Sequence, residues 1–277
     1  MRPISHDERL VLAAAYLCIP SGTLRLLASG DESVLRRWER DESPHRLKEA
    51  RNFAGVTADR LERERAYVLT FGDPDYPSGL RDLSTAPPFL IVRGTLPFGG
   101  VAIIGSRTPP AEAAAFALVL ARALREPTIA GLALGIDAQV HRGTMEAGAA
   151  TVAYVGYGLG ATYPAEHRKL EREIIKCGGA IATERLPGET AAPWALVKRD
   201  RLQAAHANAI VLVASEIDGG AMHTMHFATK LGRPRFVLDA KGGSGYEGNV
   251  QARQAGATPI PMDVEAAVER IRSALES

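Results

Sequence analysis

The chain has 277 residues, of which 46% are hydrophobic and 23% charged, and its formal net charge is +1. These values are ordinary for a folded globular protein, and the length allows one large domain and a small one. The near-zero charge excludes a protein that is basic throughout, so any nucleic-acid site must be a local patch. The two cysteines, Cys18 and Cys177, match no metal or redox spacing, and we expect buried free thiols in a reducing cytosol.

Residues 1–66 are predicted to form a small domain of short helices, of the SAM or helix-hairpin type. Its segments open with residues such as Ser5 and stop at residues such as Gly55, which is typical of helix ends. The apolar run at residues 10–20, LVLAAAYLCIP, is too short to cross a membrane and lacks a clear small-residue cleavage site. We interpret it as a core helix and expect a cytoplasmic protein with no membrane partner.

From Tyr67 the pattern changes to alternating strands and helices. Short β-rich runs and segments of helical periodicity follow one another with short connections, which favours a parallel sheet covered by helices on both faces. A flexible glycine-rich loop is expected at residues 241–250. The expected strands are 66–71, 88–94, 101–106, 127–131, 150–156, 179–184, 209–215 and 234–239, and the expected helices are 109–125, 137–147, 164–177, 200–207, 220–231 and 263–275.

Glycine and basic residues recur in the segments that follow the predicted strands. Ligands of open parallel sheets bind beyond the carboxyl ends of the strands, and glycine allows a backbone to approach a phosphate closely. A Gly-Ser-Arg turn at 105–107 follows one strand, and a basic cluster, VKRDR, occupies residues 197–201 in a predicted loop. We therefore predict a phosphate or DNA site formed by Gly105, Ser106, Arg107, Gly135, Lys198, Arg199, Arg201, Gly219 and Gly220.

Several of these features have a purely structural alternative. The turn at 105–107 fits a helix N-cap as well as a phosphate cradle. Asp137 and His141 lie four apart on one helical face, where an acid–imidazole hydrogen bond is favoured over a zinc pair. His223 and His226 lack a cysteine or carboxylate at ligand spacing. No metal and no cofactor is predicted.

Seven motifs in order resemble the DNA-processing protein A (DprA/Smf) family. The resemblance runs from about Tyr67 to about Ile260. It implies an extended Rossmann-like domain over residues 67–277 that binds single-stranded DNA, passes it to a RecA-type recombinase in natural transformation, forms a homodimer and catalyses no covalent step. The motifs are IIGSRTP, IAGLALGIDAQVHRGTMEAG, TVAYVGYGLGATYPAEHRKL, GGAIATE, KRDRLQAAHANAIVLVAS, GGAMHTMHFATKLGRPRFVLDA and GNVQARQAGATPI.

The family's motifs carry over by position, with three departures. Its Gly-Ser-Arg turn corresponds to Gly105–Arg107, and Ala130 replaces the serine that opens its Ser-Gly-x-Ala-x-Gly-Ile-Asp stretch. Asp200 stands between two arginines where the family has asparagine, and Ala221 replaces a serine at a helix opening. The extra carboxylate competes with phosphate for the arginines, and the alanine removes a hydroxyl donor. Both changes act against high affinity for DNA.

The DNA contacts implied by the resemblance are mainly to phosphates, which carry affinity without a base code. Unpaired bases also stack on aromatic side chains. Trp194 and Tyr163 are the aromatic candidates, but core packing is the favoured interpretation of both.

Two other functions stay open at this point. A nucleoside-monophosphate phosphoribohydrolase of the LOG type shares the fold class, but the segment DGGAMHTMHFATK has no catalytic glutamate at that family's spacing. A nucleotide sensor would bind a small nucleotide in the same crevice, where Asp200 is easier to accommodate than on a DNA path. A dehydrogenase is not expected, because no G-x-G-x-x-G motif follows the strand at 101–106.

Overall fold

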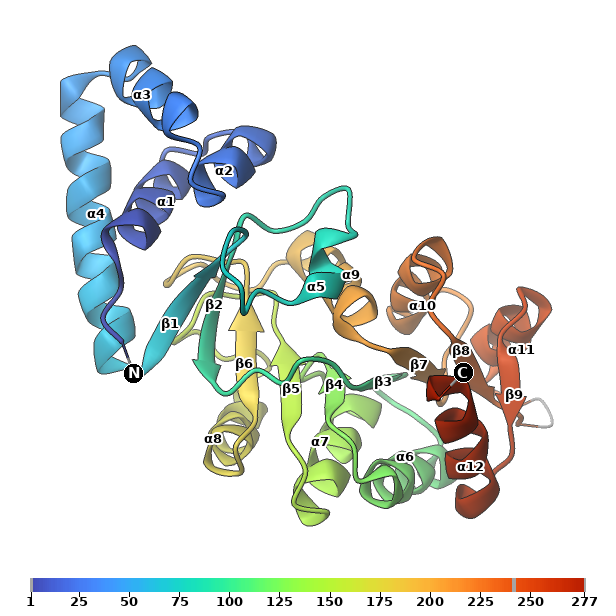
Figure 1. Cartoon of the computed structure of the whole chain (residues 1–277). Helices are drawn as coiled ribbons and strands as arrows, with labels where there is room; N and C mark the ends of the chain where they lie inside the picture. Colours follow the sequence, from blue (N-terminus) through green and yellow to red (C-terminus); the bar gives the residue numbers. More distant parts are fainter. Residues whose placement is uncertain (1, 241–242, 277) are drawn as a thin grey trace.

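The computed structural model describes residues 2–240 and 243–276, and the chain begins with four helices (Figure 1). The Ser5 side chain accepts a hydrogen bond from the Glu8 backbone while Glu8 reaches back, a capping box that fixes the first helix start. The helices are α1 (His6–Tyr16), α2 (Ser21–Ala28), α3 (Glu32–Asp41) and α4 (Pro44–Arg63).

Helix α4 continues through Gly55, where a helix end was predicted from the sequence, so that boundary was wrong. An interior glycine costs about 1 kcal/mol. The apolar stripe of α4 outweighs this cost, because it buries Leu47, Ala50, Ala54, Ala58 and Leu61.

A nine-stranded sheet forms the centre of the molecule, in the order β1-β2-β6-β5-β4-β3-β7-β8-β9. Strand β2 pairs antiparallel with β1 and β6, and all other pairings are parallel. The α/β class with a mostly parallel sheet is confirmed. The strands are β1 (Ala66–Thr70), β2 (Phe89–Gly94), β3 (Val101–Ile104), β4 (Thr128–Ala130), β5 (Thr151–Tyr154), β6 (Ala180–Thr183), β7 (Ala209–Leu212), β8 (Arg235–Leu238) and β9 (Thr258–Ile260).

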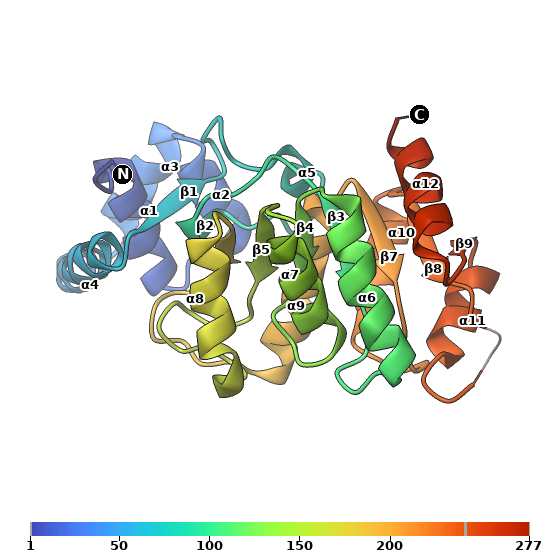
Figure 2. The ribbon, with the colours of Figure 1, turned by 90° about the horizontal axis from the view of Figure 1, so that it is seen from below.

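Helices cover both faces of this sheet. Figure 2 shows one face covered by α8, α7, α6 and α12, while α5, α9, α10 and α11 pack on the opposite face. Alternate residues of β3 therefore enter two different cores, since Val101 and Ile103 pack against α6 and Ala102 and Ile104 against the other layer. The bounds are α5 (Ser78–Arg81), α6 (Ala111–Leu124), α7 (Ile136–Glu146), η1 (Ala165–His167), α8 (Arg168–Lys176), α9 (Pro193–His206), α10 (Ala221–Lys230), α11 (Glu247–Gln254) and α12 (Val264–Leu275).

The N-terminal helices share a hydrophobic core with the sheet edge at β1 and β2. Leu61 of α4, Val68 of β1 and Ile91 of β2 belong to one buried cluster.

Both cysteines are exposed, so the expectation of buried thiols was wrong. Among the described residues, no helix combines the length and hydrophobicity that crossing a bilayer requires.

The elements in the second half of the chain also differ from the prediction in three places. Helix α9 begins at Pro193, seven residues before the predicted start at 200. Residues 247–250 belong to α11 rather than to a loop, and residues 241–242 of that predicted loop lie outside the described part of the chain. Strand β9 was not predicted. The first of these errors decides the geometry of the site.

Candidate nucleic-acid interface

A cleft lies at the carboxyl end of the sheet, where the strand order reverses. Strand β3 has β4 on one side and β7 on the other, which is the switch point at which open α/β sheets bind ligands. The cleft has a volume of about 570 Å³. It is lined by the turns that follow β3 and β7, by one face of α9 and by the start of α10.

The predicted Gly-Ser-Arg turn lies on the wall of this cleft. Gly105 permits close packing, because a Cβ there would lie 2.6 Å from Ile136 Cγ1 and 2.8 Å from the Ala214 oxygen. The Ser106 N–H donates to that Ala214 oxygen at 2.7 Å, which ties the turn to the end of β7. The N-cap of α6 is Pro110, so the turn does not cap the helix that follows.

The Arg107 side chain is the available cation of the turn. Arg107 is exposed, and within the described part of the chain it makes no side-chain hydrogen bond or ion pair. An exposed guanidinium with five donors is suited to bind a phosphate. The neighbouring start of α10, with Gly219 and Gly220, adds the positive end of a helix dipole to the same cleft.

Gly135 lies behind the turn rather than on the cleft wall. Its φ is +75° and its ψ −124°, a conformation that favours glycine. A Cβ at this position would clash with the Ser106 oxygen and lie 2.6 Å from the Arg107 oxygen. Because the Ile136 N–H donates to the Ser106 oxygen at 3.1 Å, Gly135 positions the turn instead of contacting a ligand.

The basic cluster at 197–201 belongs to helix α9, not to a loop, and its members face two sides. Residues three and four apart share a helical face, so Leu196, Arg199, Asp200 and Gln203 line the cleft. Lys198 and Arg201 do not line it. The structure therefore does not bring the three basic side chains together on the cleft wall, and contact of Lys198 and Arg201 with DNA stays a prediction.

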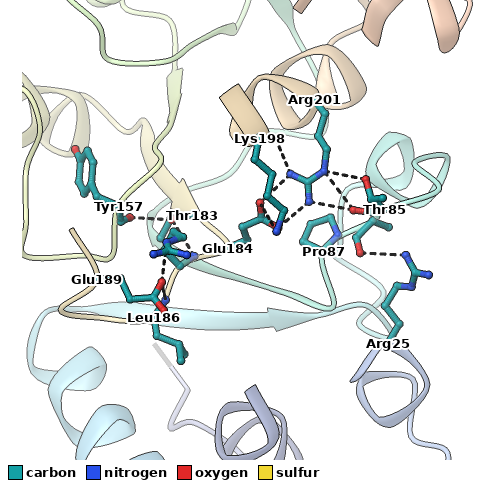
Figure 3. A network of polar contacts seen from close by, with 12 residues as sticks. Arg25, Thr85, Pro87, Tyr157, Thr183, Glu184, Leu186, Glu189, Lys198 and Arg201 are labelled. Atoms are coloured by element: carbon teal, nitrogen blue, oxygen red, sulfur yellow. Dashed lines mark hydrogen bonds and ion pairs between the residues drawn. The ribbon is translucent and has the colours of Figure 1, made fainter. Parts of the chain in front are cut away.

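Arg201 is instead a buried structural cation. Figure 3 shows it directed at Glu184, whose Oε1 and Oε2 lie 2.8 and 2.7 Å from Nη1 and Nη2 of the guanidinium. Its Nη2 also donates to the Thr85 oxygen at 3.0 Å. The Lys198 ammonium lies 3.6 Å from the same glutamate. These contacts join α9 to the end of β6 and to the segment before β2.

Arg199 lies on the cleft floor with two carboxylates near it. Its Nε is 3.4 Å from Asp200 Oδ1, and the Arg199 side chain is only 7% exposed. A Cβ on Gly131 would overlap the Arg199 guanidinium, so that glycine makes room for it. Asp137 accepts hydrogen bonds from the backbone N–H groups of Gly131 at 2.9 Å and Ala133 at 3.2 Å.

Burial controls the ionisation of both floor carboxylates. It raises the pKa of Asp200 to about 7, although Arg199 acts in the opposite direction. It also raises the pKa of Asp137, against the effects of Arg199 and of the two backbone hydrogen bonds. The cleft is not a basic surface, because its lining holds four carboxylates and two guanidinium groups, namely Asp137, Asp200, Glu216 and Asp218 with Arg107 and Arg199.

Asp200→Asn is expected to change the pH dependence of stability. Asp200 has a raised pKa in the folded state, so its stabilising contribution is complete below its ordinary pKa near 3.8 and lost as pH rises through about 7. The wild type should therefore lose more unfolding free energy between pH 5 and pH 8 than the variant does. Urea unfolding at both pH values measures this difference, and equal losses would contradict it.

Two further interpretations from the sequence were wrong. Asp137 and His141 are not hydrogen-bonded to each other, because His141 Nδ1 pairs with Thr151 Oγ1 at 2.7 Å. Burial lowers the pKa of His141 to about 3. Trp194 and Tyr163 are 56% and 46% exposed instead of packed in the core. Tyr163 lines the cleft. Trp194, in the first turn of α9, stacks against the Arg185 guanidinium, whose Cζ lies 4.7 Å from the centroid of the indole ring.

Comparison with known proteins identifies the family. The sequence profile of the DNA recombination-mediator protein A family matches residues 67–272. This chain belongs to that family. The matched segment contains the whole sheet except Ala66, and every residue of the cleft.

Curated relatives carry the names Smf and DprA. Protein Smf of Synechocystis is 29% identical over 187 residues, which cover 64% of this chain and 47% of the relative. The DNA processing protein DprA of Streptococcus pneumoniae is 28% identical over 171 residues, which cover 60% of each chain. The chain thus spans about half of the length of the curated relatives it matches.

Solved structures share the fold. DprA from Streptococcus pneumoniae superimposes with a TM-score of 0.71 at 21% identity, covering 96% of this chain and 92% of that one. DprA from Helicobacter pylori, which binds single-stranded DNA, gives a TM-score of 0.66 at 22% identity, covering 74% of this chain and 96% of that one.

In this member of the family, the cleft also contains residues that were not predicted from the sequence. Gln203 and Thr224 come from the cleft faces of α9 and α10, and Ser215 follows β7. Ser215 could have been selected, because it lies at the carboxyl end of the predicted strand 209–215, as Gly105 does in the predicted strand 101–106. Gln203 could not, because its orientation depends on the start of α9.

Proposed function

We propose that this protein binds single-stranded DNA at the switch-point cleft and acts as a recombination mediator that passes the strand to a RecA-type recombinase. The observation that supports this most directly is the exposed Arg107, which has no hydrogen-bond or ion-pair partner among the described residues and lies on a turn held by Gly105 and Gly135. Family membership and the single-stranded DNA bound by the Helicobacter pylori protein support the same function.

The contacts available in the cleft suit a single strand better than a duplex. One phosphate binds at Arg107 and the start of α10, where the guanidinium supplies donors and the positive end of the helix dipole attracts the anion. Bases of a single strand are free to stack on Tyr163 and Trp194, which are exposed at and beside the cleft. Bases in a duplex are already stacked and paired, so they cannot use these side chains.

Arg107→Ala is expected to weaken binding to single-stranded DNA by about tenfold or more, because a charge-assisted phosphate contact contributes about 1.5–3 kcal/mol. The slope of log K against log salt should fall by about 0.7 if one phosphate contact is lost. Fluorescence anisotropy of a labelled oligo(dT) across a salt series measures both quantities.

The matched control is Arg122→Ala. Arg122 is half exposed at the far end of α6 and pairs with Glu146, away from the residues that line the cleft. It should leave affinity and slope unchanged. Equal effects of the two variants, or tighter binding of wild type to duplex than to single strands, would contradict the proposed function.

Passing the strand to a recombinase requires a separate measurement. The ATPase activity of a RecA-type recombinase should rise when wild-type protein is added to single strands covered by a single-strand binding protein. Arg107→Ala should lose this stimulation in proportion to its lost DNA affinity. We further propose that residues 1–66 and 67–277 are two domains, which share the core between α4 and strands β1 and β2. We also propose that the protein works as a homodimer, which light scattering with and without DNA would test.

The nucleotide sensor remains a second candidate because of the cleft's size and charge. A volume of about 570 Å³ is within the range of small-ligand pockets, and four carboxylates are unusual on a path for polyanionic DNA. Competition between mononucleotides and oligonucleotides for the cleft distinguishes the two functions, since a sensor binds the mononucleotide alone.

A further inference from the structure

We propose that the cleft selects one guanine nucleotide, with Asp200 on the floor accepting hydrogen bonds from the Watson–Crick edge of the base. In a bound strand this nucleotide would turn its base into the cleft while its phosphate stays at Arg107. The inference rests on the proposed function for the strand, but the guanine site itself can be measured with a mononucleotide.

The arrangement of donors and acceptors in the cleft carries this inference. Arg107 provides a cation and α10 provides the positive end of a helix dipole, so the anionic end of a ligand binds beside them. The floor provides acceptors, since Asp200 and Asp137 lie beside the single guanidinium of Arg199. A continuous run of phosphates across this floor would meet two carboxylates. A ligand with a phosphate at one end and donors at the other avoids that repulsion.

Both oxygens of Asp200 keep acceptor capacity for a ligand, because each carboxylate oxygen has two lone pairs and, among the described residues, only Oδ1 uses one of them. Its Oδ1 accepts from Gln203 Nε2 at 3.1 Å and lies 3.4 Å from Arg199 Nε. Within the described part of the chain its Oδ2 has no hydrogen-bond partner. Because Asp200 lines the cleft and its side chain is only 11% exposed, a hydrogen bond from a bound base would be shielded from water.

The chemistry of a carboxylate then selects the base. An ionised carboxylate accepts hydrogen bonds but donates none. Guanine presents two adjacent donors, N1–H and the N2 amino group, to such a group. Adenine and cytosine place a ring lone pair next to their amino group, and thymine has one donor between two carbonyl oxygens. Only guanine pairs with a carboxylate through two hydrogen bonds without a facing lone pair.

The first test measures binding of dGMP, dIMP and dAMP by isothermal titration calorimetry at pH 8. Inosine keeps N1–H and lacks the N2 amino group. Wild type should bind dGMP about tenfold or more tightly than dAMP, as expected for a bidentate base contact of about 1–3 kcal/mol, with dIMP between them. Asp200→Asn should bind dGMP and dAMP within about twofold of each other, because the amide presents a donor as well as an acceptor.

Asp218→Asn is the matched control, because Asp218 is an exposed carboxylate at the cleft and its replacement removes the same charge. It should keep the guanine preference. Equal binding of dGMP and dAMP by wild type, or a preference that survives in Asp200→Asn, would overturn the inference. In that case oligo(dT) binding that depends on Arg107 would leave the proposed DNA function standing. Absence of binding to oligonucleotides both with and without guanine, together with a guanine preference among the mononucleotides, would reject the DNA function and keep the guanine site.

The pH dependence of the preference is a second test. The guanine preference requires an ionised Asp200, and burial raises the pKa of this carboxyl to about 7. The other titratable or charged groups around it are Asp137, Arg199, Arg107, Glu216, Asp218 and His223. Those near the phosphate change binding of all nucleotides alike, so the ratio of dGMP to dAMP affinity reports on the floor carboxylates Asp200 and Asp137, and its loss of pH dependence in Asp200→Asn assigns the effect to Asp200. The ratio should fall toward one between pH 8 and pH 5, and a ratio that is constant over this range would contradict the assignment.

Discussion

Arg201→Ala is expected to lower the free energy of unfolding by about 3 to 5 kcal/mol, the largest effect on stability that we predict. The Arg201 and Glu184 side chains are 4% and 10% exposed, and both guanidinium Nη atoms contact the carboxylate (Figure 3). Within the described part of the chain, removing the cation leaves the buried Glu184 carboxylate with the half-exposed Lys198, at 3.6 Å, as its remaining ion-pair partner. It also leaves the Thr85 oxygen without its donors.

Urea unfolding measures this loss, and Arg253→Ala is the control. Arg253 pairs with Asp239 at 2.7 Å, but both side chains are about half exposed, so its loss should cost about 1 kcal/mol or less. Where folded Arg201→Ala can be obtained at low temperature, its salt slope for oligo(dT) should equal that of wild type. A lowered slope with unchanged stability would mean that Arg201 contacts phosphate after all.

This contrast between Arg201 and Arg107 illustrates what the sequence could predict. The fold class follows from the alternation of apolar strands and helical segments, which needs only local periodicity. The position of the site follows too, because turns after parallel strands meet at one edge and the glycines at 105, 219 and 220 mark them. Those predictions require the order of the elements but not the rotation of any helix.

The orientation of α9 could not be predicted in the same way. Placing the helix start at 200 left residues 197–199 in a loop and Arg201 at the very start of a helix, so every basic side chain was free to face the ligand. The actual start at Pro193 makes them helical, and a helix separates Arg199 from Arg201 by about 200°. The partner of Arg201, Glu184, comes from another strand end, so only the tertiary structure identifies this ion pair.

The prediction that the two aromatic side chains are buried failed for a related reason. Large aromatic residues are buried on average, which favoured core positions for Trp194 and Tyr163. Trp194 lies in the first turn of α9, and it stacks on Arg185 instead of entering a core. A composition-based expectation cannot detect such a position, because it depends on where the helix begins relative to the sheet.

Gly135→Ala is expected to abolish most single-stranded DNA binding, although Gly135 does not line the cleft. The backbone conformation of Gly135, with φ of +75° and ψ of −124°, is unfavourable for alanine, and the added Cβ would meet the carbonyl oxygens of Ser106 and Arg107. Backbone atoms cannot move aside as a flexible side chain can. The Gly-Ser-Arg turn must therefore shift, at a cost of about 2 kcal/mol or more in stability, and Arg107 loses its position at the phosphate.

Gly148→Ala separates this effect from the general cost of alanine at positive φ. Gly148 follows the same helix, α7, with φ of +71°, and an added Cβ would have no described atom within 4 Å, so only the backbone penalty of about 1 kcal/mol applies. Anisotropy with oligo(dT), below the unfolding temperature of both variants, should show at least a tenfold loss for Gly135→Ala, comparable to losing a charged hydrogen bond. Gly148→Ala should bind as wild type does. If both variants bind equally well, the turn tolerates displacement, and the phosphate must be held by groups other than Gly105–Arg107.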